Sequence, residues 1–190
     1  MKLIERKEYM EFLKRHKDRN LIKVVSGVRR CGKSTLFELF QKDLLEQGVP
    51  KENIISINFE DLAFENLQEY HALYQYVTLH MQPTGINYIF LDEIQHVPDF
   101  EKAVDSLFIK ENADIYITGS NAYFMSGDLA TLLSGRYVEL KMLPLSFQEY
   151  YEASSLKANH SLQEIYEHYI TESSFPYTLQ LNGRQQDINE

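Results

Sequence analysis

Eight consecutive residues, Gly27-Val28-Arg29-Arg30-Cys31-Gly32-Lys33-Ser34, have the types and the spacing needed to hold a phosphate group. They match the P-loop pattern G-x-x-x-x-G-K-[ST]. In such a loop the glycines let backbone N–H groups turn towards an anion, the lysine reaches the β- and γ-phosphates, and the hydroxyl ligates Mg²⁺. The sequence therefore predicts that the chain binds a nucleoside triphosphate.

The predicted nucleotide contacts run from the first glycine of this loop into the helix that follows. They are Gly27, Val28, Arg29, Arg30, Cys31, Gly32, Lys33, Ser34 and Thr35. Two interpretations stay open for Arg29 and Arg30, which either approach a phosphate or the base, or tether the loop. Cys31 occupies a variable position of the pattern, so we do not expect it to be a nucleophile.

An apolar segment, residues 88–91, ends in the adjacent acids Asp92 and Glu93, which is the Walker B pattern. P-loop nucleoside triphosphatases place such an aspartate in the Mg²⁺ shell, so Asp92 is a predicted metal ligand together with Ser34. Glu93, one residue further on, is predicted to polarise the attacking water as a general base. Two acids at a strand end also occur as ordinary surface residues, but their position after a P-loop favours the catalytic interpretation.

Three more polar residues are candidates for contact with the reacting phosphate. Ser120 and Asn121 follow a strand that should neighbour the P-loop strand, where a polar side chain can bond both the γ-phosphate and the attacking water. Helix capping is the alternative for both, because serine and asparagine are favoured caps. Arg136 is a candidate for offsetting the charge on the transferred phosphoryl group, acting on its own chain or on a neighbour. The alternative is a surface arginine or the partner of an acid.

Alternating strands and helices are predicted to position these residues. Short apolar runs predict five strands, at 21–25, 53–59, 88–91, 114–118 and 137–142. Predicted helices are a charged amphipathic one at 5–18, the P-loop helix at 34–47, one with apolar residues at 67, 70, 74, 77 and 81, one at 99–110, and a short one at 121–133. The capping boxes Ser146/Glu149 and Ser161/Glu164 predict two more helices. This alternation is typical of an α/β fold with a parallel sheet.

Composition narrows the functional classes. The 190 residues have a formal net charge of −9, with 28 acidic and 19 basic residues, which argues against a surface built mainly to hold nucleic acid. One cysteine excludes an intrachain disulfide framework and suits a reducing compartment. No stretch reaches the 18 or more apolar residues of a membrane span, and no signal peptide opens the chain. We expect a cytoplasmic protein that binds no membrane. The net charge gives no support for nucleic-acid binding, although a local basic patch or a further domain could still provide it.

Six motifs in order resemble those of the prokaryotic AAA+-type ATPases of the archaeal-ATPase-like group, which is related to the STAND signalling ATPases. They are residues 27–34, Ile57-Asn-Phe-Glu-Asp61, Ile89-Phe-Leu-Asp-Glu-Ile-Gln95, Ile117-Thr-Gly-Ser-Asn121, Leu133-Ser-Gly-Arg136 and Pro144-Leu-Ser-Phe-Gln-Glu-Tyr150. The resemblance implies a three-layer P-loop NTPase fold with a sheet ordered 5-1-4-3-2 and helices on both faces. It also implies ATP, Mg²⁺, Glu93 as the catalytic base and Arg136 as an arginine finger or sensor. The Asn-Lys-x-Asp element with which GTPases read guanine does not follow the acidic strand, which favours ATP over GTP.

The resemblance also sets expectations for the rest of the chain. Members of this group usually continue through a lid, a winged helix and a C-terminal domain, and their Gly-Gly-Phe-Pro-like element reads Ser173-Ser174-Phe175-Pro176 here. We expect an ATPase core at 1–145, the start of a lid or following domain at 146–190, and a truncated product. A homo-oligomer or a C-terminal partner domain would receive the effect of ATP hydrolysis. The alternatives are a STAND-like switch with negligible turnover and a small-molecule kinase.

Overall fold

The computed structural model describes residues 4, 6–120, 133, 135–171 and 174–176. Five strands form one parallel sheet in the order β2-β3-β4-β1-β5, which confirms the predicted order read from its other edge. Their bounds are β1 (Ile22–Gly27), β2 (Ile54–Asn58), β3 (Asn87–Asp92), β4 (Ala113–Gly119) and β5 (Tyr137–Met142). Because all strands run the same way, their carboxyl ends meet at one edge, where the phosphate loop leaves β1.

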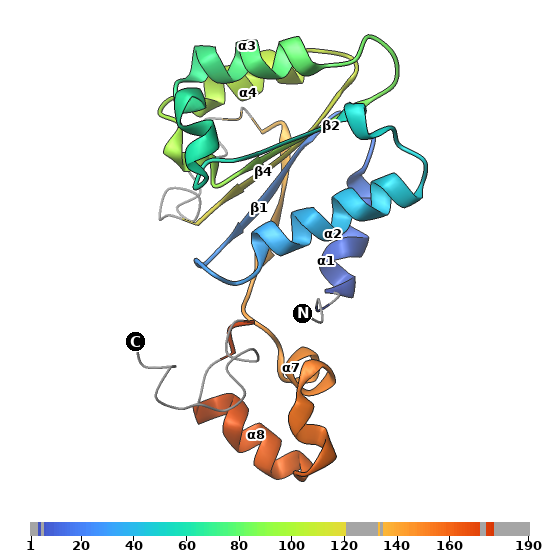
Figure 1. Ribbon diagram of the computed structural model, residues 1–190, viewed down its shortest axis with the longest axis vertical. Helices are drawn as coiled ribbons and strands as arrows, with labels where there is room; N and C mark the ends of the chain where they lie inside the picture. The colour runs from blue at the N-terminus through green and yellow to red at the C-terminus, as the bar shows by residue number, and fades with distance from the viewer. Residues whose placement is uncertain (1–3, 5, 121–132, 134, 172–173, 177–190) are drawn as a thin grey trace.

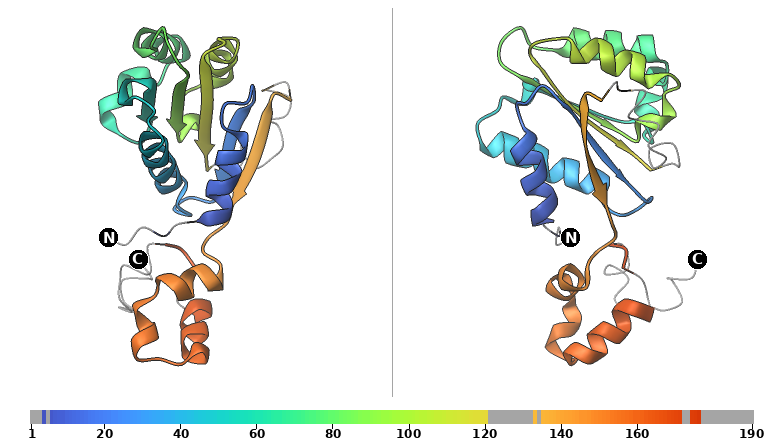
Figure 2. Two further views of the ribbon diagram at one scale, coloured as in Figure 1. Left: turned by 90° about the vertical axis from the view of Figure 1, so that its right-hand side faces the viewer. Right: turned by 180° about the vertical axis from the view of Figure 1, so that it is seen from behind.

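Helices cover both faces of the sheet, which gives the three predicted layers (Figures 1 and 2). The helices α1 (Lys7–His16) and α2 (Lys33–Glu46) lie on one face, and α3 (Tyr70–His80) and α4 (Phe100–Phe108) on the other. Both faces of β1 are buried, which explains why successive residues of the strand are apolar. Val24 packs in the core on the α3/α4 face, whereas Val25 packs in the core on the α1/α2 face.

One helical prediction differs from the structure at its start. The apolar spacing from residue 67 predicted one helix, but residues Leu62–Leu67 form a separate 3₁₀ turn and α3 begins only at Tyr70. The Glu69 side chain accepts a hydrogen bond from Ala72 N at 2.9 Å, and this cap sets the start of α3. Among the described residues, three other 3₁₀ turns occupy Lys51–Asn53, Ile94–His96 and Ser155–Ala158. The predicted helix at 121–133 lies outside the described residues, apart from Leu133.

The segment after β5 forms two helices beyond the end of the sheet, α7 (Phe147–Ala153) and α8 (Leu162–Thr171), drawn in orange at the bottom of Figure 1. Both predicted capping boxes are present, at Ser146/Glu149 and Ser161/Glu164. The two helices pack in a small core of their own, made of Leu145, Tyr150 and Ile165. The division of the chain at residue 145/146 stays a prediction.

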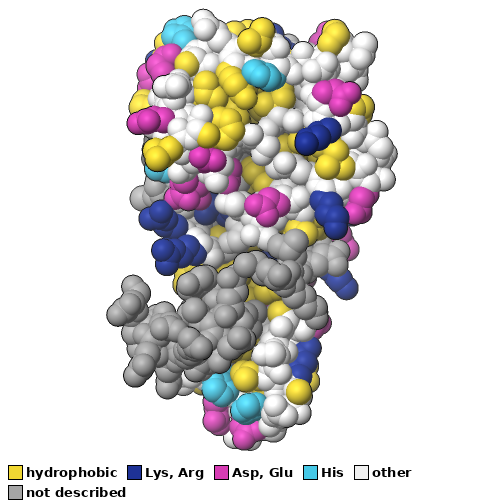
Figure 3. All heavy atoms as spheres, in the orientation of Figure 1, with side chains coloured by type: hydrophobic (Ala, Val, Ile, Leu, Met, Phe, Trp, Pro, Cys, Tyr) yellow, Lys and Arg dark blue, Asp and Glu magenta, His cyan; other side chains and the backbone are white. Residues whose placement is uncertain are grey.

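The described surface carries charges of both signs and several exposed apolar side chains. In Figure 3 hydrophobic side chains gather in the upper part of the visible face, over α3, while acidic and basic side chains alternate over the rest of its described part. Leu62 and Leu79 are 82% and 83% exposed. None of the described helices is long and apolar enough to cross a membrane.

Candidate nucleotide-binding site

The phosphate loop joins β1 to α2, and two glycines give it its shape. A Cβ on Gly27 would lie 2.3 Å from the Met142 carbonyl oxygen, so only glycine fits there. Gly32 has φ of 103°, in the left-handed region that glycine adopts easily, and it is the N-cap of α2. A tight backbone loop that leads into a helix N-terminus directs N–H groups and the helix dipole at the same point. These residues therefore fit a phosphate group.

Lys33 is the first residue of α2, and its side chain turns back into the loop. Its Nζ lies 3.3 Å from Gly27 O and 3.4 Å from Val28 O, and only 3% of the residue is exposed. The same Nζ lies 3.0 Å from Glu93 Oε1, in an ion pair whose two side chains are 2% and 8% exposed. The structure thus brings together the predicted phosphate-binding cation and the predicted general base.

Asp92 and Glu93 stand at the carboxyl end of β3, where a residue of the neighbouring β4 holds both. Thr118 Oγ1 donates a hydrogen bond to Asp92 Oδ1 at 2.5 Å and accepts one from Glu93 N at 2.8 Å. Glu93 has φ of 53°, a left-handed conformation that is uncommon for a residue with a side chain. This backbone turn sends the two neighbouring carboxylates in different directions. Sequence reasoning did not identify Thr118, which lies two residues before the predicted Ser120.

The second oxygen of the Glu93 carboxylate is also held. Glu93 Oε2 accepts hydrogen bonds from Gln95 Nε2 at 2.5 Å and from Ser120 Oγ at 2.7 Å. Burial acts to raise the pKa of Glu93, but these two hydrogen bonds and the charge of Lys33 outweigh it, so the pKa lies below its ordinary value. Glu93 is therefore an ionised carboxylate in this arrangement. Gln95 had no predicted role, although it lies in the motif that carries the acids.

Asp92 has the chemistry of a divalent-metal ligand. Burial raises the pKa of Asp92, and hydrogen bonds from Ser34 and Thr118 offset this only in part. A hydroxyl and a carboxylate are the hard oxygen donors that Mg²⁺ prefers, so Ser34 and Asp92 together fit this ion. A cation there would favour the ionised carboxylate, because metal ligands bind in the deprotonated form.

The two arginines of the loop lie at the surface. Arg29 Nη2 pairs with Glu60 Oε1 at 2.9 Å, with side chains 73% and 44% exposed. Glu60 follows β2, so this pair tethers the loop to the neighbouring strand end. Arg30 is exposed and has φ of 66°. Of the two interpretations left open for Arg29, the structure agrees with the tether.

The remaining loop residues differ in exposure. Val28 is 37% exposed, and Thr35 is half-buried in the first turn of α2. Cys31 is fully buried, and burial raises the pKa of its thiol, which agrees with the expectation that it is not a nucleophile.

Arg136 lies at the opposite edge of the sheet. It directly precedes β5, its carbonyl oxygen accepts a hydrogen bond from Ile22 N at 2.9 Å, and its guanidinium lies 5.7 Å from the centre of the Phe108 ring. The strand β1 separates Ile22 from the loop at Gly27, and at ~3.3 Å per residue this distance is about 17 Å. The structure therefore does not bring Arg136 to the phosphate loop of its own chain. The trans alternative stays a prediction, and Asn121 lies outside the described residues.

A phosphate loop after β1, acids at the end of β3 and a parallel 2-3-4-1-5 sheet together define a P-loop fold of the AAA+ type. The sequence model of the AAA domain matches residues 19–151, and the chain belongs to this family.

Two relatives in sequence are longer proteins. An uncharacterized protein of Haemophilus influenzae is 41% identical over 176 residues, which cover 92% of this chain and 44% of that protein. An uncharacterized protein of Methanocaldococcus jannaschii is 36% identical over 132 residues, covering 69% of this chain and 28% of that protein. The chain thus spans less than half the length of either relative.

Solved structures share the fold at low sequence identity. The Walker-type ATPase of Pyrococcus abyssi aligns with 98% of this chain and 70% of its own, at a TM-score of 0.64 and 18% identity. AMPPCP-bound DnaA from Aquifex aeolicus aligns with 96% of this chain and 59% of its own, at a TM-score of 0.60 and 14% identity. At such identities the likeness concerns the fold alone.

Proposed function

We propose that this chain is the core of an ATPase that binds ATP with Mg²⁺ and hydrolyses it. The observation that carries the proposal is the meeting of Lys33, Asp92 and Glu93 at the carboxyl edge of the sheet, beside the phosphate loop. A cation for the phosphates, a metal ligand and a general base are the three groups that this reaction needs beyond the loop itself.

Each of these side chains has a defined task in the proposed reaction. The loop from Gly27 to Lys33 binds the phosphates, and Ser34 and Asp92 hold the metal ion. Bound Mg²⁺ supplies positive charge that neutralises the β- and γ-phosphate oxygens. Glu93 takes a proton from water as the water oxygen bonds to the γ-phosphorus and the bond to the β–γ bridging oxygen breaks, which leaves ADP and phosphate.

The Lys33–Glu93 ion pair means that Lys33 must change its partner when ATP binds. Lys33 cannot neutralise Glu93 and the β/γ-phosphates equally well at the same time, since its ammonium is a single point charge. ATP binding therefore exchanges Glu93 for phosphate as the partner of Lys33. This exchange frees Glu93 Oε1, the oxygen that Lys33 contacts at 3.0 Å, to act as the base.

One observation favours the alternative of a nucleotide-dependent switch with negligible turnover. Both oxygens of the Glu93 carboxylate already have donors, namely Lys33, Gln95 and Ser120. A base that stays in these contacts when ATP is bound would not activate water, and the nucleotide would then only set the conformation of the chain.

Phosphate release from Mg·ATP without any added acceptor tests the proposal. Steady release supports the ATPase, a single slow turnover supports the switch, and no release until an acceptor is added supports a small-molecule kinase. Asp92→Asn provides the internal check on the metal, because loss of this carboxylate should remove the Mg²⁺ dependence of nucleotide binding. An Asp92→Asn chain that binds and hydrolyses ATP with unchanged Mg²⁺ dependence would contradict the proposed metal site.

The proposal includes a domain or partner whose conformation changes when ATP is hydrolysed. Since the chain spans 44% and 28% of the two relatives, a further domain of a longer protein is one candidate, and a second copy of the chain is the other.

A further inference from the structure

Arg6, just before α1, hydrogen-bonds to three other segments of the chain. Its guanidinium donates to Glu149 Oε1 at 2.8 Å and Oε2 at 3.1 Å, to Leu143 O at 2.7 Å, to Pro144 O at 3.2 Å, and to Cys31 O at 3.3 Å. These contacts use all five N–H groups that a guanidinium carries. Only 5% of Arg6 is exposed, so a charged group is buried and fully hydrogen-bonded at the junction of the phosphate loop and the C-terminal helices.

The contact with Cys31 bears directly on the phosphate loop. The peptide group between Cys31 and Gly32 is planar and trans, so the carbonyl of Cys31 and the N–H of Gly32 point in opposite directions. By holding the carbonyl, Arg6 fixes the orientation of that N–H away from itself. A hydrogen bond from a charged donor also polarises the peptide group, which makes the N–H a stronger donor to an anion.

Glu149 connects this arrangement to α7. Besides Arg6, its Oε2 accepts hydrogen bonds from Ser146 N at 2.8 Å and Ser146 Oγ at 2.9 Å, in the capping box that begins the helix. One carboxylate thus joins the first turn of α7 to the guanidinium that holds the loop. Burial acts to raise the pKa of Glu149, but the hydrogen bonds from Arg6 and Ser146 lower it below its ordinary value.

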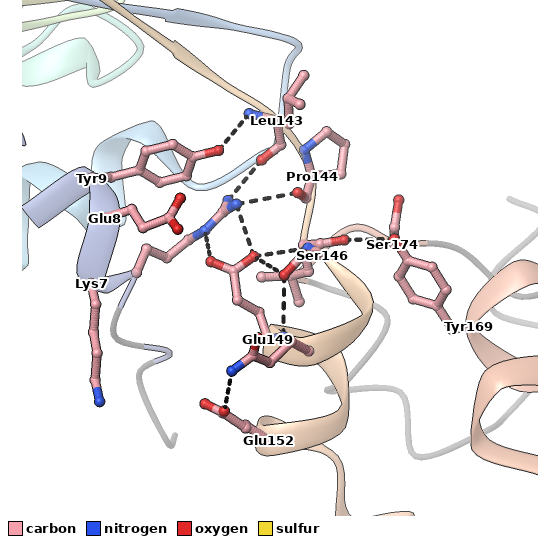
Figure 4. Close-up of a pocket in the computed structure, with 13 residues that line it drawn as sticks. Lys7, Glu8, Tyr9, Leu143, Pro144, Ser146, Glu149, Glu152, Tyr169 and Ser174 are labelled. Carbon is pink, nitrogen blue, oxygen red and sulfur yellow. Dashed lines mark hydrogen bonds and ion pairs between the residues drawn. The ribbon is translucent and has the colours of Figure 1, made fainter. Parts of the chain in front are cut away.

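Arg6 lies beside a groove that separates α1 from α7. This groove of about 840 Å³ is lined by Lys7, Glu8 and Tyr9 on one side and by residues of the α7 segment, including Glu152, on the other. Figure 4 shows the two sets of side chains facing each other across this space, with the hydrogen-bonded network between them. An open groove beside a buried ion pair leaves α7 room to shift when the pair changes.

We propose that Arg6 is a positioning residue of the nucleotide site: it holds the Cys31–Gly32 peptide group in its phosphate-binding orientation and, through Glu149, couples that orientation to α7. This inference rests on the nucleotide-binding part of the proposed function. Binding at the loop and the packing of α7 then influence each other by the same factor, because coupling between two sites is reciprocal.

The matched variants are Glu149→Gln and Glu164→Gln. Glutamine is accepted at this position of a capping box, so both variants keep the cap of their helix. Only Glu149→Gln removes the ion pair with Arg6, whereas Glu164 accepts hydrogen bonds from Ser161 in its capping box and lies near the charges of His160 and His168. Any difference between the two variants therefore reports the pair and not the cap.

Two measurements on the whole chain with Mg²⁺ and the β,γ-methylene analogue of ATP test the inference. Calorimetric titration should show at least about fivefold weaker binding in Glu149→Gln, the lower range of coupling between sites, and parental binding in Glu164→Gln. Hydrogen exchange in the parent should slow at 27–35 and also at 147–153 when the analogue binds. In Glu149→Gln the response at 147–153 should disappear. Parental affinity together with a parental response of α7 in Glu149→Gln overturns the inference.

Exchange without nucleotide separates this inference from the proposed function. Glu149→Gln should speed exchange at 27–35 relative to Glu164→Gln, whether or not the parent binds the analogue. A parent that binds no analogue overturns the proposed function, and unchanged exchange in the loop overturns the coupling. If Glu149→Gln fails to fold, Arg6→Lys replaces it, because lysine keeps the charge and loses the planar fork that reaches several acceptors at once. Parental loop exchange in Arg6→Lys overturns the inference in the same way.

Discussion

Lys33 and Glu93 neutralise each other in a largely buried ion pair of 3.0 Å. The backbone of each residue is also fixed in place. Lys33 is the first residue of α2, and the N–H of Glu93 donates a hydrogen bond to Thr118 Oγ1. A buried charge that loses its partner is destabilising, so the pair opens only when another charge replaces one member. The phosphates of a nucleotide are such a charge. Changing Lys33 should therefore affect ATP binding, whereas changing Glu93 should affect ATP hydrolysis.

Lys33→Ala should remove most of the stabilisation that ATP confers on the chain, because the β/γ-phosphates lose their dedicated cation. A ligand at about 100 times its Kd raises the free energy of unfolding by about 2.7 kcal/mol. The measurement is the shift of Tm on adding Mg·ATP, taken within each variant, since Lys33→Ala also leaves Glu93 without its partner. Equal shifts in the parent and in Lys33→Ala would refute the phosphate-loop assignment.

Glu93→Gln should bind ATP at least as tightly as the parent, because a neutral amide no longer competes for Lys33. Its hydrolysis should fall by about 10²- to 10⁴-fold, the usual contribution of a positioned general base. Binding is measured by titration and hydrolysis by phosphate release, with the exposed Glu111→Gln as the matched control. Parental hydrolysis in Glu93→Gln sinks the catalytic-base role.

At the scale of elements, β1 and β4 are joined by a buried ion pair far from the phosphate loop. Lys23 and Asp114 are 0% and 2% exposed and in direct contact. Asp114 also accepts hydrogen bonds from Asp18 N at 2.9 Å and Tyr116 Oη at 2.8 Å. Burial lowers the pKa of Lys23 and raises that of Asp114, despite their mutual attraction. The pair is therefore important for strand packing and has no part in the nucleotide site.

Asp114→Ala should destabilise the chain by roughly 3–5 kcal/mol, because it leaves the Lys23 ammonium buried without its counter-charge. Asp114→Asn should cost less, since an amide oxygen still accepts from Asp18 and Tyr116. Denaturant unfolding measures both. Nucleotide affinity, measured well below the unfolding transition, should match the parent. A large loss of affinity in stable Asp114→Asn protein would show that the two ends of the sheet are coupled.

At the scale of the whole molecule, the parallel sheet separates two sets of residues. The phosphate loop and the acid pair occupy the carboxyl edge, whereas Arg136 precedes β5 at the amino edge and contacts Phe108. An arginine in that place reaches a γ-phosphate only on another molecule. If Arg136 serves catalysis, the active unit contains more than one chain.

If Arg136 serves catalysis in this way, turnover per subunit should rise with protein concentration, while ATP binding stays constant. Arg136→Ala should lower turnover, by up to about 10³-fold if it acts as an arginine finger. Mixing it with Glu93→Gln tests the trans role directly, since the intact Glu93 site of one chain can use Arg136 of the other. Recovery of activity in the mixture establishes the trans finger. Unchanged turnover in Arg136→Ala alone would show that Arg136 has no catalytic role.

Much of the fold could be predicted from the sequence because local patterns specify it. The apolar run that forms β3 extends to Asp92 in the structure, and the two capping boxes start α7 and α8 as predicted. The order of strands came with the family resemblance and is confirmed by the parallel pairings. The predicted start of α3 was wrong because the apolar spacing continued through a 3₁₀ turn, whose Phe64 and Leu67 pack partly buried against the same core.

The sequence by itself determined where a phosphate is expected to bind, since the P-loop pattern is contiguous and places its glycines, lysine and hydroxyl within eight residues. It also placed the two acids, because an apolar strand can deliver them only at its end. Only the tertiary structure decided that Thr118 holds both acids, that Lys33 pairs with Glu93, that Arg6 meets Glu149 across 143 residues, and that Arg136 lies at the far edge. These facts depend on which strand ends and helix ends the fold brings together. No local pattern encodes that neighbourhood, because it arises when the whole sheet buries its two faces at once.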